Sequence, residues 1–146
     1  TALQADVRFA SPDSTFGIPA ARLGLGYEYE GLDLLTSIVG PARARDIMIS
    51  ARYFGADEGL QMGLVNFVIP RNEIRDFVTG YAMRVAANAP LTIRAARAAI
   101  ADVVKDPTRQ DRAAVQALID QCFDSDDYRE GRRAFAEKRL PAFKGT

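Results

Sequence analysis

The fold is organised by residues 39–70, which read VGPARARDIMISARYFGADEGLQMGLVNFVIP. The Gly-Pro pair at 40–41 separates two helical patterns, because glycine suits the end of one helix and proline the first position of the next. We therefore predict a helix over residues 41–51 and a shorter one over 56–63. The LVNFVIP that follows (64–70) is rich in β-branched and aromatic residues and indicates a strand.

The flanking residues add a second strand and more helices. VRFAS (7–11) alternates apolar and polar side chains and predicts a strand, whereas SPDSTFGIP (11–19) is dense in turn formers and predicts a loop. Apolar spacing predicts further helices over residues 30–39 and 72–88, and Pro90 separates the latter from one over 92–105. The Asp106-Pro107 pair predicts the start of a helix over 106–122, and Ser125 with two acidic residues predicts the start of one over 125–139. The chain therefore begins with mixed structure and continues as helices.

Two strands make an incomplete sheet, since a lone pair of strands is marginally stable in water. Either a partner chain supplies the remaining strands, or an upstream half of the same protein does. Because position 1 is Thr rather than Met, we favour an upstream half.

Composition excludes several kinds of chemistry. The 146 residues carry 19 basic and 19 acidic side chains, so no net field draws the chain to nucleic acid or an anionic membrane. The chain has no histidine, which rules out a Ser-His-Asp triad or a His-ligated zinc within it. The single Cys122 excludes an internal disulfide and is compatible with a reducing cytosol. No apolar run reaches the ~20 residues of a membrane span. We expect a cytoplasmic protein with no metal site.

Three blocks of sequence are informative through their order and spacing. They are ADVRFASPDSTFGIPAARLGLG (5–26), the stretch 39–70, and SDDYREGRRAFAEKRLPAFKG (125–145). Together they resemble the C-terminal portion of the crotonase (enoyl-CoA hydratase/isomerase) superfamily. The resemblance implies an α/β fold, with the C-terminal part of a crotonase-like ββα superhelix over residues 1–70 and an α-helical trimerisation region over residues 71–146.

The resemblance also implies the chemistry of an acyl-CoA thioester. Members of the superfamily use two backbone N–H groups as an oxyanion hole for the thioester enolate, and carboxylates move the protons. They are commonly homotrimers or dimers of trimers, and the resemblance implies no cofactor beyond the coenzyme A carried by the substrate. Both oxyanion-hole donors and one hydratase glutamate would lie upstream of Thr1. The other hydratase glutamate would follow Pro19, where this sequence has Ala20.

Glu28 and Glu30, in GYEYEG (26–31), are the candidate catalytic residues. In some isomerases and dehalogenases of the superfamily, an active-site aspartate occupies a similar place. In an extended segment the two side chains would point the same way, whereas on a helix they would diverge by about 200°. Alternatively, they are solvated acids favoured by the dipole of the helix over residues 30–39.

Further residues are candidates for binding the substrate or its coenzyme A. They are Ala20, Leu25, Tyr27, Phe135 and Lys138. Phe135 and Lys138 would contact the adenine and phosphates of coenzyme A, or would belong to an exposed helix end with core aromatics. Two functions remain open. One is an enzyme of the enoyl-CoA hydratase/isomerase type, and the other is a catalytically weak acyl-CoA-binding or assembly subunit with the same fold.

Overall fold

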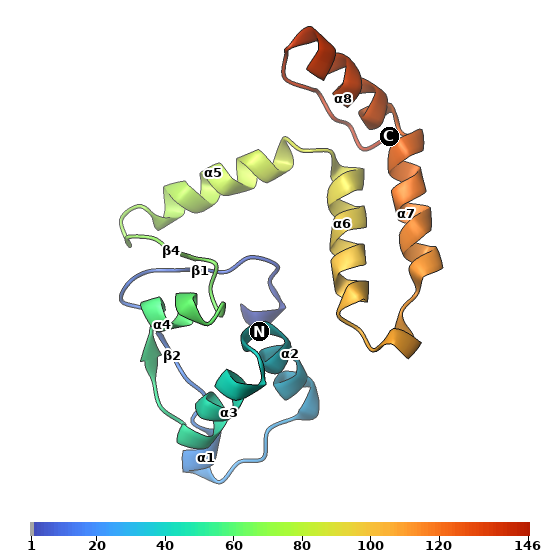
Figure 1. Ribbon diagram of the computed structural model, residues 1–146. Coiled ribbons are helices and arrows are strands. Elements are labelled where there is room, and N and C mark those ends of the chain that lie inside the picture. The colour runs from blue at the N-terminus through green and yellow to red at the C-terminus, as the bar shows by residue number, and fades with distance from the viewer. Residues whose placement is uncertain (1) are drawn as a thin grey trace. The chain divides into compact units, whose positions relative to one another are not determined.

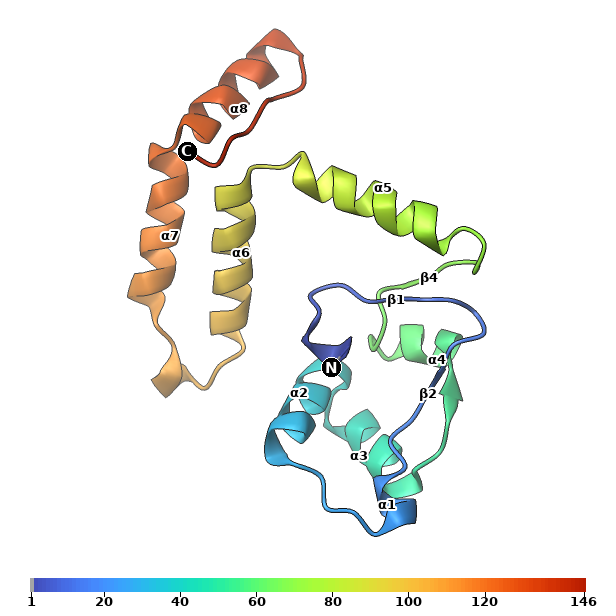
Figure 2. The same ribbon diagram turned by 180° about the vertical axis from the view of Figure 1, so that it is seen from behind.

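A computed structural model describes residues 2–146, which form two compact units. Unit 1 extends to Thr79, and unit 2 comprises Gly80–Thr146. Figures 1 and 2 show the strands and short helices of unit 1 and the long helices of unit 2. Among the described residues, no helix combines the length and apolar character needed to cross a membrane.

Unit 1 contains two small sheets. Strand β1 (Phe9–Ala10) lies parallel to β4 (Phe67–Val68), and β2 (Thr15–Phe16) lies antiparallel to β3 (Phe54–Gly55). The two predicted strands therefore pair with each other, and the rings of Phe9 and Phe67 stack with centroids 5.3 Å apart.

The sequence-based account of the strands was wrong in three respects. The observed strands β1 and β4 are shorter than the predicted ranges 7–11 and 64–70, and β2 lies inside the predicted loop over 11–19. The strand β3 was not predicted. Two-residue strands are too short to show a period-2 pattern, so only their pairing in space identifies them.

The helices of unit 1 follow the glycine and proline signals. They are the 3₁₀ turn η1 (Ala2–Gln4), α1 (Ala20–Leu23), α2 (Tyr29–Val39), α3 (Pro41–Ser50) and α4 (Ala56–Gln61). Gly40 joins α2 to α3 with a positive φ of 79°, a conformation that costs glycine little, and Pro41 opens α3 as predicted. The core of unit 1 is centred on Leu35 and Ile47, which are 2% and 1% exposed.

Helix α5 (Ile74–Ala86) begins in unit 1 and ends in unit 2. Unit 2 continues with α6 (Pro90–Val103), the 3₁₀ turn η2 (Pro107–Arg109), α7 (Arg112–Asp124) and α8 (Asp126–Glu137). Helices α6 and α7 lie side by side as a hairpin in both views.

The single helix predicted over residues 106–122 is interrupted. Asp106 caps only η2, and Asp111 begins α7 by accepting a hydrogen bond from the N–H of Ala114 at 2.9 Å. The break is fixed by the buried Asp102, whose carboxylate accepts hydrogen bonds from the Asp111 N–H at 3.1 Å and from Nζ of Lys105 at 2.7 Å. This partner nine residues away is invisible to local helix signals. The helix predicted over residues 125–139 is observed as α8, and the Ser125 hydroxyl caps it by accepting from the Tyr128 N–H at 3.0 Å.

Candidate functional site

The first group of candidate residues lies on the segment that links α1 to α2. Ala20 opens α1 and is only 5% exposed, so its methyl group packs inside unit 1. Gly24 ends α1 in the left-handed conformation with φ of 66°, and the N–H of Leu25 donates to the Ala20 carbonyl at 3.1 Å. The chain then runs without regular structure to Glu28.

Glu28 occupies the N-cap position of α2, immediately before the first helical residue. Its backbone is extended, and its carbonyl accepts from the N–H groups of Gly31 and Leu32 at 3.1 and 3.2 Å. Its carboxylate does not cap the helix and takes no hydrogen bond or ion pair within residues 2–146. Glu30 lies in the first turn of α2, and both glutamates are exposed. The negative charges lie where the helix dipole favours them, in keeping with the solvated alternative.

The two glutamates adopt neither of the simple geometries considered from sequence. Glu28 is extended and Glu30 is helical, so the backbone changes conformation between them. They are therefore not a matched pair of carboxylates on one face, and any shared role would need a ligand that reaches both.

The same segment exposes large apolar side chains next to Glu28. Leu25 is 61% exposed, Tyr27 44% and Tyr29 79%. The Tyr27 ring folds back over the first turn of α2. Its Cε1 atom is so close to Gly31 that a Cβ at that residue would lie only 2.7 Å away. Ala20, Leu25, Tyr27, Glu28 and Glu30 therefore lie on one continuous segment that combines an unpartnered carboxylate with apolar surface.

The second group of candidate residues lies at the end of α8 in unit 2. Phe135 is 88% exposed, and Lys138 ends α8 in the left-handed conformation with φ of 54°. The Lys138 N–H donates to the Phe135 carbonyl at 3.2 Å, so the two residues share the final turn. Both are exposed, as expected of a contact to a ligand and equally of a solvated helix end.

Phe135 also borders a cavity of about 630 Å³ within unit 2. Its wall is formed mainly by small and aromatic residues of α6, α7 and α8, with Ile119, Asp127 and Arg132 among them, together with Phe143 from the segment after α8. Cys122 is half-buried and lies in this wall.

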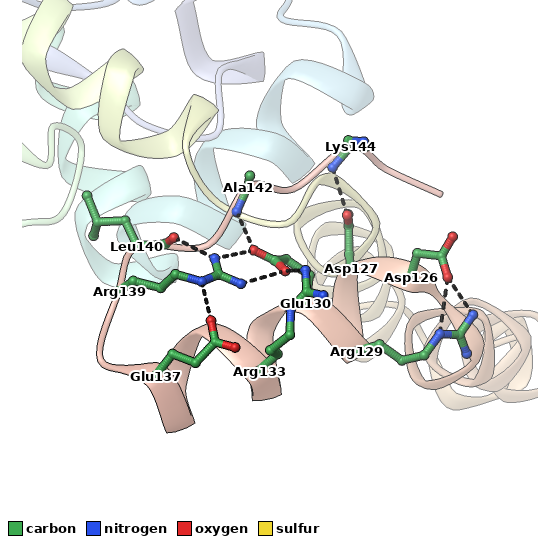
Figure 3. A network of polar contacts seen from close by, with 10 residues as sticks. All are labelled: Asp126, Asp127, Arg129, Glu130, Arg133, Glu137, Arg139, Leu140, Ala142 and Lys144. Atoms are coloured by element: carbon green, nitrogen blue, oxygen red, sulfur yellow. Dashed lines mark hydrogen bonds and ion pairs between the residues drawn. The ribbon is translucent and has the colours of Figure 1, made fainter.

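A polar network holds the end of α8, and sequence reasoning missed it (Figure 3). Glu130 accepts from Nη1 of Arg139 at 2.6 Å and from Nη2 of Arg133 at 2.5 Å. The hydrogen bond from Arg139 is the main cause that holds the pKa of Glu130 well below its usual range. The spacing of Glu130 and Arg133 signals an ordinary helix pair. The bond from Arg139, nine residues on, depends on the chain turning back after Lys138.

Unit 1 has its own charged cluster, also missed from sequence. Arg52 donates to Asp46 at 2.6 Å and to Glu58 at 2.9 Å, and its guanidinium lies 5.6 Å from the centre of the Phe54 ring. These bonds join α3 to α4 and give Arg52 a structural role. Within residues 2–146, no group of three or more His, Cys, Asp or Glu side chains is placed to hold a metal ion.

Comparisons with known proteins identify the family of the chain. The family model described as enoyl-CoA hydratase/isomerase matches residues 1–146. The chain is 30% identical to a short-chain-enoyl-CoA hydratase of Clostridium acetobutylicum over 144 residues, which is 98% of this chain and 55% of that protein. It is 32% identical to a carnitinyl-CoA dehydratase of Salmonella paratyphi A over 148 residues, which is 99% of this chain and 57% of that protein.

Solved structures agree with the sequence comparison. An enoyl-CoA hydratase/carnithine racemase from Magnetospirillum magneticum matches with a TM-score of 0.88 and 33% identity over 99% of this chain and 53% of that chain. An enoyl-CoA hydratase from Bacillus anthracis matches with a TM-score of 0.83 and 28% identity, over 99% of this chain and 56% of that one.

These matches confirm the expected crotonase-like fold. The chain spans about half the length of the relatives it matches. Because the family model covers residues 1–146, the chain belongs to the enoyl-CoA hydratase/isomerase family, of which it corresponds to a C-terminal portion.

Proposed function

We propose that the whole protein is an acyl-CoA enzyme of the hydratase/isomerase type in which Glu28 moves the proton. The observation that carries this proposal is the Glu28 carboxylate, which is exposed, takes no hydrogen bond or ion pair within residues 2–146, and lies between Tyr27 and Tyr29 on an apolar segment. Relatives of the chain include a short-chain-enoyl-CoA hydratase and a carnitinyl-CoA dehydratase, which supports a thioester substrate.

A single carboxylate suits proton transfer within the acyl chain better than addition of water. In an isomerisation, one carboxylate removes the proton at C2 of a 3-enoyl thioester and returns it at C4, so protons balance without a second acid. The enolate formed between these steps would be stabilised by an oxyanion hole upstream of Thr1. Ala20, in the place expected for the second hydratase glutamate, is buried and has no proton to give.

The remaining candidate residues complete the proposed substrate site. Leu25 and Tyr27 would form part of the acyl wall, and Ala20 would leave space that a glutamate would otherwise fill. The aromatic ring of Phe135 and the ammonium of Lys138 would meet the adenine and phosphates of coenzyme A, in a homotrimer or a dimer of trimers. Their high exposure is consistent with this role.

One observation favours a second candidate function. The absence of an acid at Ala20 is also what a subunit would show if it had kept the fold and thioester binding but lost catalysis. Such a protein would be an acyl-CoA-binding or assembly subunit.

The test uses the full-length protein that contains this chain, assayed with a short-chain 2-enoyl-CoA and a 3-enoyl-CoA. Glu28→Gln should lower kcat by roughly 10²- to 10⁴-fold, the usual contribution of general acid–base catalysis, with little change in thioester binding. Glu30→Gln should have the smaller effect. Asp33→Asn is a matched control, because Asp33 is an exposed acid on the same helix.

The outcomes separate the candidate functions. Equal, nonzero turnover by wild type and Glu28→Gln would remove Glu28 from the mechanism. Thioester binding without turnover on either substrate would favour the binding subunit. Turnover by residues 1–146 alone would contradict an oxyanion hole located upstream.

A further inference from the structure

The last residues of the chain turn back along α8 as a strap. We define the C-terminal strap as residues 140–146, which have no regular secondary structure. Exposure alternates along it, because Pro141, Phe143 and Gly145 are partly buried while the residues between them are exposed. This period of two is typical of an extended segment with one face on the protein.

Two carboxylates of α8 hold the strap through its backbone (Figure 3). The oxygens of Asp127 accept from the N–H groups of Lys144 at 2.7 Å and Gly145 at 2.9 Å. An oxygen of Glu130 accepts from the Ala142 N–H at 3.1 Å. Asp127 is only 4% exposed, so both of its oxygens are engaged away from water.

The end of the strap also satisfies α8 and reaches α6. The backbone oxygen of Thr146 accepts from the N–H groups of Asp126 and Asp127 at 2.7 and 3.3 Å, where the start of a helix leaves donors unpaired. Gly145 has φ of 81°, and a Cβ there would lie 3.0 Å from Cγ of Pro90 at the start of α6. The strap therefore ties α8 to the α6–α7 hairpin.

The strap also forms part of the wall of the unit 2 cavity. Phe143 lies in that wall, and its Cε1 atom is 3.5 Å from the Cβ position of Gly131 on α8. A methyl group at Gly131 would be in ordinary van der Waals contact with the ring, so Phe143 packs closely against this face of α8. Moving the strap would remove this aromatic group from the cavity.

We propose that the C-terminal strap is a releasable part of the wall of the unit 2 cavity, with Asp127 as its latch. The strap has no β-ladder, and its polar attachments are concentrated on two carboxylates and one helix start. Helices α6 and α7 pack on each other without it. The strap can therefore open while the hairpin stays folded, as expected for a local unfolding unit.

The test compares Asp127→Asn with Asp126→Asn in the full-length protein that contains this chain. Asparagine at 127 keeps one acceptor oxygen but turns an NH₂ group toward the other strap N–H, which loses its bond. Asp126 is a matched control, because its side chain is exposed and pairs only with Arg129 at 2.6 Å, while its backbone bond to Thr146 remains. Both variants remove one negative charge from the start of α8.

Two measurements report opening of the strap. Hydrogen exchange at Lys144 and Gly145 should become roughly 10- to 100-fold faster in Asp127→Asn, the loss expected for a bond to a charged acceptor. Cys122, the one cysteine of the chain, lies in the cavity wall, so its labelling by an aromatic disulfide reagent should accelerate in the same variant. Asp126→Asn should match the wild type in both measurements, and exchange in α6 and α7 should stay unchanged.

Two results would overturn the proposal. One is wild-type exchange and labelling in Asp127→Asn, and the other is equal acceleration throughout α6, α7 and the strap, which would show that the strap does not open separately. If Asp127→Asn does not fold, Gly145→Ala serves as the second variant. It strains the strap at its positive φ without touching α8, and the same two criteria apply.

Discussion

Replacing Gly31 with alanine tests how Tyr27 is held next to Glu28. Gly31 lies in the first turn of α2, and a Cβ there would lie 2.7 Å from Cε1 of Tyr27. Because the ring belongs to a side chain that is 44% exposed, it can swing away toward solvent instead of straining the helix. The substitution should therefore displace Tyr27 while α2 remains intact.

The size of the effect follows from two opposing contributions. Alanine in place of glycine stabilises a helix by up to about 1 kcal/mol. Burying a large aromatic side chain completely contributes about 1.5–3 kcal/mol, so displacing the partly buried Tyr27 ring costs about 1 kcal/mol. In the wild-type background, the stabilisation from alanine and the cost of displacing the Tyr27 ring should nearly cancel, so Gly31→Ala should leave the free energy of unfolding almost unchanged. In a Tyr27→Ala background the alanine at position 31 should give its full stabilisation.

The assay is a double-mutant cycle measured by urea unfolding. The four proteins are the wild type, Gly31→Ala, Tyr27→Ala and the double variant, and the coupling free energy between the two positions should be about 1 kcal/mol. A coupling within about 0.3 kcal/mol of zero would refute the reasoning, because it would show that the Tyr27 ring does not rest on Gly31. Gly80→Ala in α5 supplies a reference for the helix gain alone, since the nearest atom to its Cβ position is 3.7 Å away, at Nη1 of Arg84.

Two further predictions concern the stability of unit 1. Ile47 is 1% exposed, so Ile47→Ala should lower the free energy of unfolding by about 2–5 kcal/mol and Ile47→Val by about 0.5–1.5 kcal/mol. Urea unfolding measures both losses, and equal losses would show that the site collapses around the smaller side chain. The hydrogen bonds from Arg52 lower the pKa values of Asp46 and Glu58, so these acids stabilise unit 1 above the ordinary carboxyl pKa and lose that effect as the pH falls through the lowered folded-state values. The urea midpoint should therefore fall more steeply between about pH 5 and pH 3 in the wild type than in Arg52→Gln, and parallel curves would contradict the assignment.

The sequence predicted most helices because their signals are local. Gly40 and Pro41 mark the junction of α2 and α3, and Ser125 marks the start of α8, each through a preference of the residue itself. The helix predicted over 106–122 failed for the opposite reason, because its break depends on Asp102 reaching the backbone of Asp111.

The candidate site likewise combines features that the sequence indicated with features that only the structure shows. The resemblance to the crotonase superfamily pointed to Glu28 and Glu30, and the exposure of both glutamates is what the structure adds. Glu28 ends an extended segment and Glu30 lies in the first turn of α2, and this difference depends on where α2 starts, which sequence patterns locate only within a few residues. The sequence did not indicate that Tyr27 folds over Gly31, since that contact needs the turn between them to be formed.

The sequence by itself determined the family-like order of blocks, the helical second half and the kinds of chemistry available, because these depend on residue identity and short-range spacing. Because the chain has no histidine, the groups in it that could transfer protons are carboxylates, tyrosines, lysines and the thiol of Cys122. Only the tertiary structure decided which distant groups meet, such as Asp127 with the strap at Lys144 and Gly145. Such contacts form only when the chain turns back on itself, and the burial that makes them strong does not exist in the unfolded chain.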